Sequence, residues 1–580
     1  MDTQRLILFL VFSFSLMFLW EAWQRHVNPP PPVTAASPAT PGKAQPGAGQ
    51  PADVPSVAAP AAPPAASSPG AGGVPVAPGT PSAAAAAQGA QGDTVTITTD
   101  LYRATIDSVG GVISEVALLR HRDATEPTQP FRVIKRGDAI SIAQAGLLGE
   151  GLPNHRTPYR VLPGPRELAT GTDTLELKLE TTGANGDPVV QTLTFRRGSY
   201  VIDARFEVTN ASAKPQMPYA YYQLTRDTKT ALPQSSWTPV AFTGPVVYNA
   251  TDNFVKVDFG EIDKLAADPK RKSPFTPKAD NGWVAMIEHY FVSAWLPKPD
   301  ERLEREFYTR KLDNGLYAVG MILPMPTLQP GEKASVSASL YAGPQDQEIL
   351  GGLAPGFDLV VDYGIFTVLA APLFWLLKWL HGLLGNWGWA IIVMTIMIKM
   401  MFYPLNAAAA RSMAKMKMVG PKLKALQEQY KNDKQQLQMK MMELYKQEKI
   451  NPLGGCLPIL VQIPVFIALY WVLLSAVELR HAPFIGYIRD LSAPDPYFVL
   501  PVLYAITAYL QVKLSPTPIT DPVQARVMQI MPIAFSVLFI FFPSGLVLYW
   551  LINNTLQIAQ QWHVNRMLEK EAAVAAAKRR

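Results

Sequence analysis

The chain has 580 residues, of which 48% are hydrophobic and only 17% are charged. This length exceeds what one soluble core normally holds, and the shortage of charge indicates membrane-embedded segments. The formal net charge is +6 and Cys456 is the single cysteine, which excludes an intramolecular disulfide and a cysteine-based metal cluster.

The N-terminal region combines an apolar run with a long linker. Residues 6–20 are apolar and no small-residue cleavage site follows them, so we interpret residues 1–27 as an uncleaved transmembrane anchor. Residues 28–92 consist mainly of Pro, Ala, Gly and Ser. They lack the large apolar residues that would offset the entropy lost on ordering, which predicts a disordered linker. We assign this linker no binding role.

Residues 93–345 carry the pattern of a large β-sandwich. Two stretches alternate between apolar and polar residues, which is typical of half-buried strands, and Asn185-Gly186 is a hairpin-turn signal. The apolar positions are Leu175, Leu177 and Leu179 in the first stretch and Tyr200, Ile202, Ala204, Phe206 and Val208 in the second. His289 beside Glu288 is the tempting catalytic residue here. The pair alone lacks the geometry of a site, so a packed aromatic segment with a satisfied histidine is the favoured interpretation.

Residues 364–385 are apolar enough to span a membrane, but Pro372 interrupts them and Lys378 and His381 give the second half a polar side. A span here would place the basic segment after residue 405 on the same side of the membrane as the β-sandwich. We therefore predict an interfacial amphipathic helix.

Residues 386–405 form the second predicted span, because about 20 helical residues cross about 30 Å of hydrocarbon. Lys399 lies inside this run. A charge at such a position costs about 2.5–3.5 kcal/mol on insertion scales and usually faces a protein interior or a wet cavity. The alternative is that its stem reaches toward nearby headgroups. The residues alone leave both alternatives open.

Residues 406–457 are strongly basic and have high helix propensity, which predicts a cytoplasmic helical hairpin. We expect helix breaks at Gly420-Pro421 and at Asn432-Asp433. The hairpin also carries Met413, Met416, Met418, Met439, Met441 and Met442. Flexible methionines suit the binding of varied apolar partners, or they pack the hairpin against itself and the membrane surface.

Residues 458–560 contain four further apolar runs, predicted as spans three to six, and residues 561–580 form a basic tail. Polar residues within these runs include Gln462 in the first and Asn553, Asn554 and Gln557 in the last. With six spans, both termini, the basic hairpin and the tail are cytoplasmic and the β-sandwich is outside, in agreement with the positive-inside rule.

A series of motifs then carries a resemblance to a known family. They include GWVAMIEHYFVSAWLP at 282–297, LYAGP at 340–344, GNWGWAII at 385–392, NPLGGCLPIL at 451–460, DLSAPDPY at 490–497 and PSGLVLYW at 543–550. With these motifs the chain, outside its linker, resembles the YidC-type membrane protein insertases of Gram-negative bacteria. The resemblance implies an inner-membrane insertase and chaperone, not an enzyme, with no cofactor or metal. It implies a polytopic α-helical protein with a five-helix core, a periplasmic β-supersandwich and a cytoplasmic hairpin.

The resemblance also implies a hydrophilic groove, open to cytoplasm and lipid, that receives nascent membrane proteins. The signature groove cation of the family is typically arginine, and Lys399 stands at the matching position, so the charge is kept and the planar fork is lost. Thr395 matches a polar groove position, Trp550 beside Tyr549 matches a substrate-contacting aromatic residue, and Gln462 is assigned to the groove as well. The implied partners are membrane lipids, the Sec translocon with its accessory subunits, and a ribosome or targeting factors at the hairpin and tail. No specific nucleic acid is implied.

Two other classes of protein are alternatives to an insertase. A secondary transporter or channel predicts internal repeats or paired broken helices, which the sequence does not display. A sugar-active enzyme is suggested by the likeness of β-supersandwiches to mutarotase-like folds, but fold analogy is a weak argument without an acid–base constellation. The chain also contains no phosphate loop, HExxH or GxSxG motif.

Overall fold

The structure is a computed structural model. It describes residues 53–56, 92–123, 126, 128–229, 242–268, 270–298, 303–430, 433–448, 457–514, 530–531, 534 and 536–578. The predicted anchor and most of the predicted linker lie outside the described residues, as do residues 532, 533 and 535 of the fifth predicted span. The chain divides into a unit comprising Pro31–Gln234 with Val240–Val360, and a second unit built mainly on Val361–Arg580. We describe each unit by itself.

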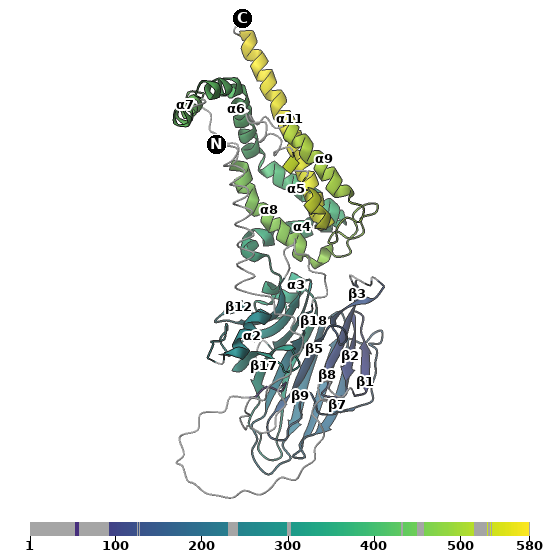
Figure 1. Ribbon diagram of the computed structural model, residues 1–580. Helices are drawn as coiled ribbons and strands as arrows, with labels where there is room; N and C mark the ends of the chain where they lie inside the picture. The colour runs from purple at the N-terminus through teal and green to yellow at the C-terminus, as the bar shows by residue number, and fades with distance from the viewer. Residues whose placement is uncertain are drawn as a thin grey trace. The chain divides into compact units, whose positions relative to one another are not determined.

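The first unit is a sandwich of two antiparallel sheets, each with nine strands among the described residues (Figure 1). The first sheet has the order β1 (Thr94–Thr98), β2 (Tyr102–Asp107), β3 (Ile113–Arg122), β5 (Ser141–Leu148), β10 (Tyr219–Arg226), β17 (Tyr317–Pro324), β16 (Arg305–Lys311) and β13 (Lys278–Ala279), with β4 (Pro130–Ile134) paired to β3. The second has the order β12 (Asn253–Lys256), β11 (Thr243–Asn249), β14 (Trp283–Glu288), β15 (Phe291–Pro297), β18 (Lys333–Pro344), β9 (Val201–Thr209), β8 (Pro188–Arg196), β7 (Thr174–Thr182) and β6 (Arg160–Val161). Two short helices, α2 (Phe259–Ala267) and α3 (Gln347–Gly351), and the 3-10 helix η2 (Phe357–Val360) complete this unit.

Aromatic side chains connect the two sheets. Tyr222 of β10 lies with its ring centroid 5.0 Å from that of Trp295 on β15, and the Trp295 indole N–H donates to the Gln223 carbonyl at 3.1 Å. The predicted sandwich is confirmed. The alternating positions in β7 and β9 are buried as expected, and Gly186 has the positive φ of 86° that the turn between β7 and β8 requires.

The His289–Glu288 pair does not form a catalytic site. His289 occupies the tight turn between β14 and β15 with a φ of 42°, and its ring lies against that of Tyr290. Glu288 is buried and forms ion pairs with Lys135 at 3.5 Å and with Arg226 at 3.6 Å. The interpretation as a packed aromatic segment therefore agrees with the structure.

The second unit is helical. Its elements are η3 (Gly364–Phe366), α4 (Thr367–Leu384), α5 (Trp387–Met401), α6 (Tyr403–Gln429), α7 (Lys434–Gln447), α8 (Leu457–Ser475), η5 (Val477–Leu479), α9 (Val499–Leu514), η6 (Phe539–Phe541) and α11 (Ser544–Lys578). Among the described residues, α4 alone is one straight helix long and apolar enough to cross a membrane. Helix α5 with the start of α6 qualifies as a second, bent candidate, so the count of six spans stays a prediction.

The apolar run at 386–405 is not one straight helix. Helix α5 ends at Met401, α6 begins at Tyr403, and the two axes differ by 60°. Pro404 in the first turn of α6 has no N–H to donate and disfavours helical geometry in the residue before it, which explains a break at this point.

A helical hairpin of α6 and α7 is present as predicted. Val419 and Leu423 of α6 form an apolar cluster with Leu444 of α7, and Asp433 caps α7 by accepting from two backbone N–H groups. The predicted break at Gly420-Pro421 is wrong, because α6 continues through Pro421. Packing of the neighbouring Val419 and Leu423 against α7 offsets the hydrogen bond that proline removes. Met441 packs on this cluster, whereas Met439 and Met442 are exposed.

Candidate functional site

Lys399 is held between two helices. Its side chain lies on the last turn of α5, the residue is only 7% exposed, and its ammonium donates to the Gln557 side-chain oxygen of α11 at 2.8 Å. Thr395 lies one turn earlier on the same face of α5 and is also buried; its hydroxyl donates to the Ile391 carbonyl at 2.7 Å. Of the two alternatives left open for Lys399, the structure supports the side chain that faces the protein.

A second contact joins α8 to the same helix. Gln462 donates from its amide nitrogen to the Asn553 side-chain oxygen at 3.2 Å. Asn553 and Gln557 are four residues apart on α11 and therefore share one face of it. One face of α11 thus offers an amide oxygen to α8 and another to the cation of α5. We call Thr395, Lys399, Gln462, Asn553 and Gln557 the polar seam.

The partner of the Lys399 charge is neutral. Among the residues that the structure describes, Lys399 forms a hydrogen bond with an amide and no ion pair with a carboxylate. A buried charge without a counter-ion is costly, and amide oxygens only partly replace its hydration. The described residues therefore provide no counter-ion for the Lys399 ammonium. The described residues also contain no group of three or more His, Cys, Asp or Glu side chains that could hold a metal ion.

The predicted aromatic pair belongs to a separate cluster. Tyr549 is only 2% exposed, whereas Trp550 is half-buried with its ring centroid 4.3 Å from that of Phe466 on α8. Phe539 and Tyr504 lie 5.4 Å and 6.1 Å from the Trp550 ring by the same measure. The Trp550 indole N–H is buried and has no hydrogen-bond partner among the described residues. Buried indole N–H groups usually have an acceptor, so this N–H is an unusual donor without a partner among the described aromatic side chains that surround it.

A compact loop covers the other ends of α5 and α11. Asn386, which caps α5, also donates to the backbone carbonyls of Pro483 and Phe484 at 3.2 Å and 3.0 Å. Ser544 at the start of α11 donates to the carbonyls of Asp490 and Ala493, both at 2.9 Å. The connection at residues 476–498 therefore contacts the first residues of both helices, at the end of α5 opposite to Lys399.

Sequence reasoning missed two residues of the seam. Asn553 and Gln557 were noticed as polar residues in the last apolar run but were not assigned to the site. Their spacing of four residues in an otherwise apolar helix was the available signal, because it places two amides on one helix face. The partners of these amides could not be found without the packing of α11 against α5 and α8.

Comparisons with known proteins agree with this arrangement along the chain. Residues 94–376 match the YidC periplasmic domain, and residues 379–571 match the family described as 60Kd inner membrane protein. The chain is 48% identical over 576 residues to the membrane protein insertase YidC of Aromatoleum aromaticum, covering 99% of this chain and 100% of the relative. It is 49% identical over 581 residues to that of Dechloromonas aromatica, covering 98% of each.

A solved structure described as an active YidC insertase with the first transmembrane domain resolved has a TM-score of 0.37 and 19% identity, over 80% of this chain and 91% of that one. The two family matches together cover well over half of the chain, and the relatives match it over nearly their full length. The chain therefore belongs to the YidC family of membrane protein insertases, which are inner-membrane proteins with a periplasmic domain.

Proposed function

We propose that this chain inserts nascent membrane proteins by receiving their polar segments along the polar seam. A polar segment that enters hydrocarbon loses its water at a cost of several kcal/mol for each unsatisfied group. The amides of Gln462, Asn553 and Gln557 and the Lys399 ammonium offer replacement partners. No ATP, metal or covalent step is needed, because the seam lowers a desolvation barrier and the burial of the client helix in lipid drives the process.

The observation that carries this proposal is the buried Lys399 charge with only an amide as its partner. An acidic residue in the extracytoplasmic tail of a client can displace the Gln557 oxygen and become the counter-ion. At about 4 Å and an effective dielectric constant near 20 the attraction is about 4 kcal/mol before desolvation is subtracted. Desolvation removes most of this gain, so the contact is transient and the client is released.

The aromatic cluster around Trp550 supplies the apolar side of the same path. The rings of Trp550, Phe466 and Phe539 give a client helix a rigid apolar surface. The vacant Trp550 indole N–H can donate to a client carbonyl that has lost water. The loop at residues 476–498 supports a groove that is closed on the periplasmic side, so that entry is from the cytoplasm and exit is into lipid.

We infer a topology of six spans with both termini in the cytoplasm, as the basic hairpin and tail indicate. Helix α4 exposes Trp375 and Trp379, which supports a position at the membrane interface. The hairpin with its exposed Met439 and Met442 would receive the ribosome, targeting factors or the emerging chain. The protein would act alone or beside the Sec translocon.

Photocrosslinking to stalled nascent membrane proteins tests the path. A photoreactive residue at position 395 or 550 is expected to capture the client, because both positions lie along the proposed route. Met397 is the matched control, since it lies on α5 between Thr395 and Lys399 and its side chain is exposed rather than buried. Equal capture from 397 and from 395 and 550 would contradict a defined route along the seam.

A further inference from the structure

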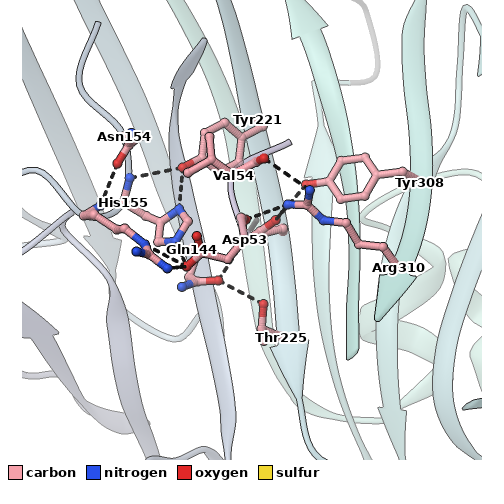
Figure 2. A network of polar contacts seen from close by, with 11 residues as sticks. Asp53, Val54, Gln144, Asn154, His155, Tyr221, Thr225, Tyr308 and Arg310 are labelled. Carbon is pink, nitrogen blue, oxygen red and sulfur yellow. Dashed lines mark hydrogen bonds and ion pairs between the residues drawn. The ribbon is translucent and has the colours of Figure 1, made fainter. Parts of the chain in front are cut away.

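A short piece of the predicted linker lies against the first sheet of the β-sandwich. The structure describes residues 53–56 of this linker, and Figure 2 shows Asp53 and Val54 near Tyr221 of β10 and Arg310 of β16. One oxygen of the Asp53 carboxylate accepts from the His155 ring at 3.0 Å and from the Arg156 guanidinium at 2.9 Å and 2.7 Å. His155 and Arg156 lie in the connection between β5 and β6, so they belong to the folded domain and not to the linker.

The backbone of the segment is recognised as well. Arg310 of β16 donates to the Asp53 carbonyl at 2.5 Å and, through its other terminal nitrogen, to the Val54 carbonyl at 3.2 Å (Figure 2). Gln223 of β10 donates to the Asp53 carbonyl at 3.2 Å. Residues 53 and 54 form a turn and a bend, so two successive carbonyls face the same planar guanidinium, and the fork fixes the backbone at both of them.

An apolar pocket receives the next side chain. Val54 is 4% exposed and packs in a cluster with Leu148, Tyr221 and Ile322, to which Tyr219 and Tyr308 add their rings. Burial of this valine side chain removes apolar surface from water, which favours docking. Pro55 after it is buried too, and its ring narrows the backbone conformations open to Val54.

The contacting groups are held in place by the sheet itself. The Tyr221 hydroxyl bonds the His155 ring at 2.5 Å and the Tyr308 hydroxyl donates to Gln223 at 2.9 Å. Gln144 accepts from Gln223 at 2.8 Å and from Thr225 at 2.9 Å. These bonds join residues of the domain only, so they orient the groups that contact Asp53 without using any linker atom. The site is therefore a feature built by the domain.

The composition of the linker makes this match specific. In residues 28–92, Asp53 is the single acidic residue and Lys43 the single basic one. The one carboxylate of the linker thus meets a paired histidine and arginine, and a valine follows it into an apolar pocket. If the linker had no binding role, the contact of its single acidic residue with His155 and Arg156 would be unexplained.

We propose that this face of the first sheet is a binding site for an acidic–aliphatic–proline segment, and that Asp53-Val54-Pro55 of the chain's own linker is its occupant. Docking shortens the chain that connects the predicted anchor to the domain. The linker of residues 28–92 reaches at most about 220 Å when extended, whereas residues 28–52 reach at most about 85 Å. The docked segment therefore acts as a fastening point that limits how far the domain moves from the membrane.

Spin labelling of the full chain tests the occupant. A nitroxide is attached at Ser56→Cys in a Cys456→Ser background, because Ser56 is exposed and next to the docked residues. We expect an immobilised spectrum that becomes mobile in D53A and in R310K, which keeps the charge but loses the fork. K43A is the matched control, since it removes the other charge of the linker, and it should leave the spectrum unchanged. D53A alters no residue of the sandwich, so its effect cannot come from unfolding of the domain.

Peptide binding tests the site itself. The synthetic peptide PADVPSV is expected to bind the full chain carrying D53A and V54S, with the Asn version PANVPSV binding about tenfold more weakly, a loss of about 1.4 kcal/mol. The wild-type chain should bind neither peptide, because its site is occupied. Spectra that are identical in D53A and wild type, or peptide binding that is equal in wild type and the double variant, would overturn the linker as occupant. Failure of PADVPSV to bind the double variant would overturn the site.

Discussion

The Lys399 ammonium lies 2.8 Å from the side-chain oxygen of Gln557, so the cation of α5 is joined to α11 by a neutral amide. A carboxylate at this position would neutralise the charge permanently. An amide satisfies one donor and leaves the charge able to attract an anion that enters the seam. The site is therefore suited to transient contact with an acidic client, as opposed to a structural ion pair.

We predict that K399A slows insertion of clients with acidic extracytoplasmic tails by about tenfold, because a net loss of about 1.4 kcal/mol in the barrier-lowering contact has this effect. K399R should be tolerated, since the charge is kept. Insertion into proteoliposomes, read by protease protection, measures the rate. A client with Asn in place of its acidic residues is the control, and an equal effect on both clients would contradict the charge role.

We predict that Q557E inhibits insertion although Lys399 is retained, because the new carboxylate forms an internal ion pair and removes the charge from the client. Gln561 lies one turn further along α11 and bonds Asn565 within the same helix, so Q561E is the matched control. Both variants should fold, which a thermal unfolding curve checks. Normal insertion of acidic clients by Q557E would show that the uncompensated charge is not needed.

We predict that deletion of residues 421–449 impairs insertion in cells and leaves the remaining helices folded. The deletion removes Leu423 and Leu444, and therefore most of the apolar cluster through which α6 and α7 pack on one another. Complementation of a depletion strain measures function, and circular dichroism of the purified protein measures helix content. A strain that grows and inserts clients normally would exclude the hairpin as a receiving element.

We predict that docking of the linker does not weaken between pH 7 and pH 5. Burial acts to raise the pKa of Asp53, but hydrogen bonds from His155 and Arg156 outweigh it and lower the pKa from 3.8 to about 2. Because the pKa of Asp53 is lowered in the docked state, the ionised carboxylate stabilises docking fully above pH 3.8. This stabilisation is lost as the pH falls toward about 2.

The nitroxide spectrum of the Ser56→Cys protein measures this directly at pH 7 and pH 5. The spectrum should stay immobilised at both values. Mobility that increases by pH 5 would mean that the Asp53 carboxyl is protonated far above the expected range, and its hydrogen bonds with His155 and Arg156 would then not hold the segment.

Local patterns in the sequence determined the elements and their types. The alternation at Leu175, Leu177 and Leu179 identified a half-buried strand because side chains of a strand point to opposite faces. The helix break expected at Asn432-Asp433 is followed by α7, whose first backbone N–H groups donate to the Asp433 carboxylate. These signals act within a few residues, so they can be read without knowing the fold.

Contacts between distant segments were decided only by the tertiary structure. Lys399 was recognisable as an unusual cation, but its partner Gln557 is 158 residues away and depends on how α11 packs on α5. Likewise, Pro421 stays inside α6 because α7 packs beside it, and Asp53 meets Arg156 103 residues later in the chain. Composition describes the average properties of the linker residues. In the proposed docking, one carboxylate and one valine are enough, because the sheet supplies matching partners. Pairing free energies depend on geometry between elements, and a linear sequence does not carry that geometry explicitly.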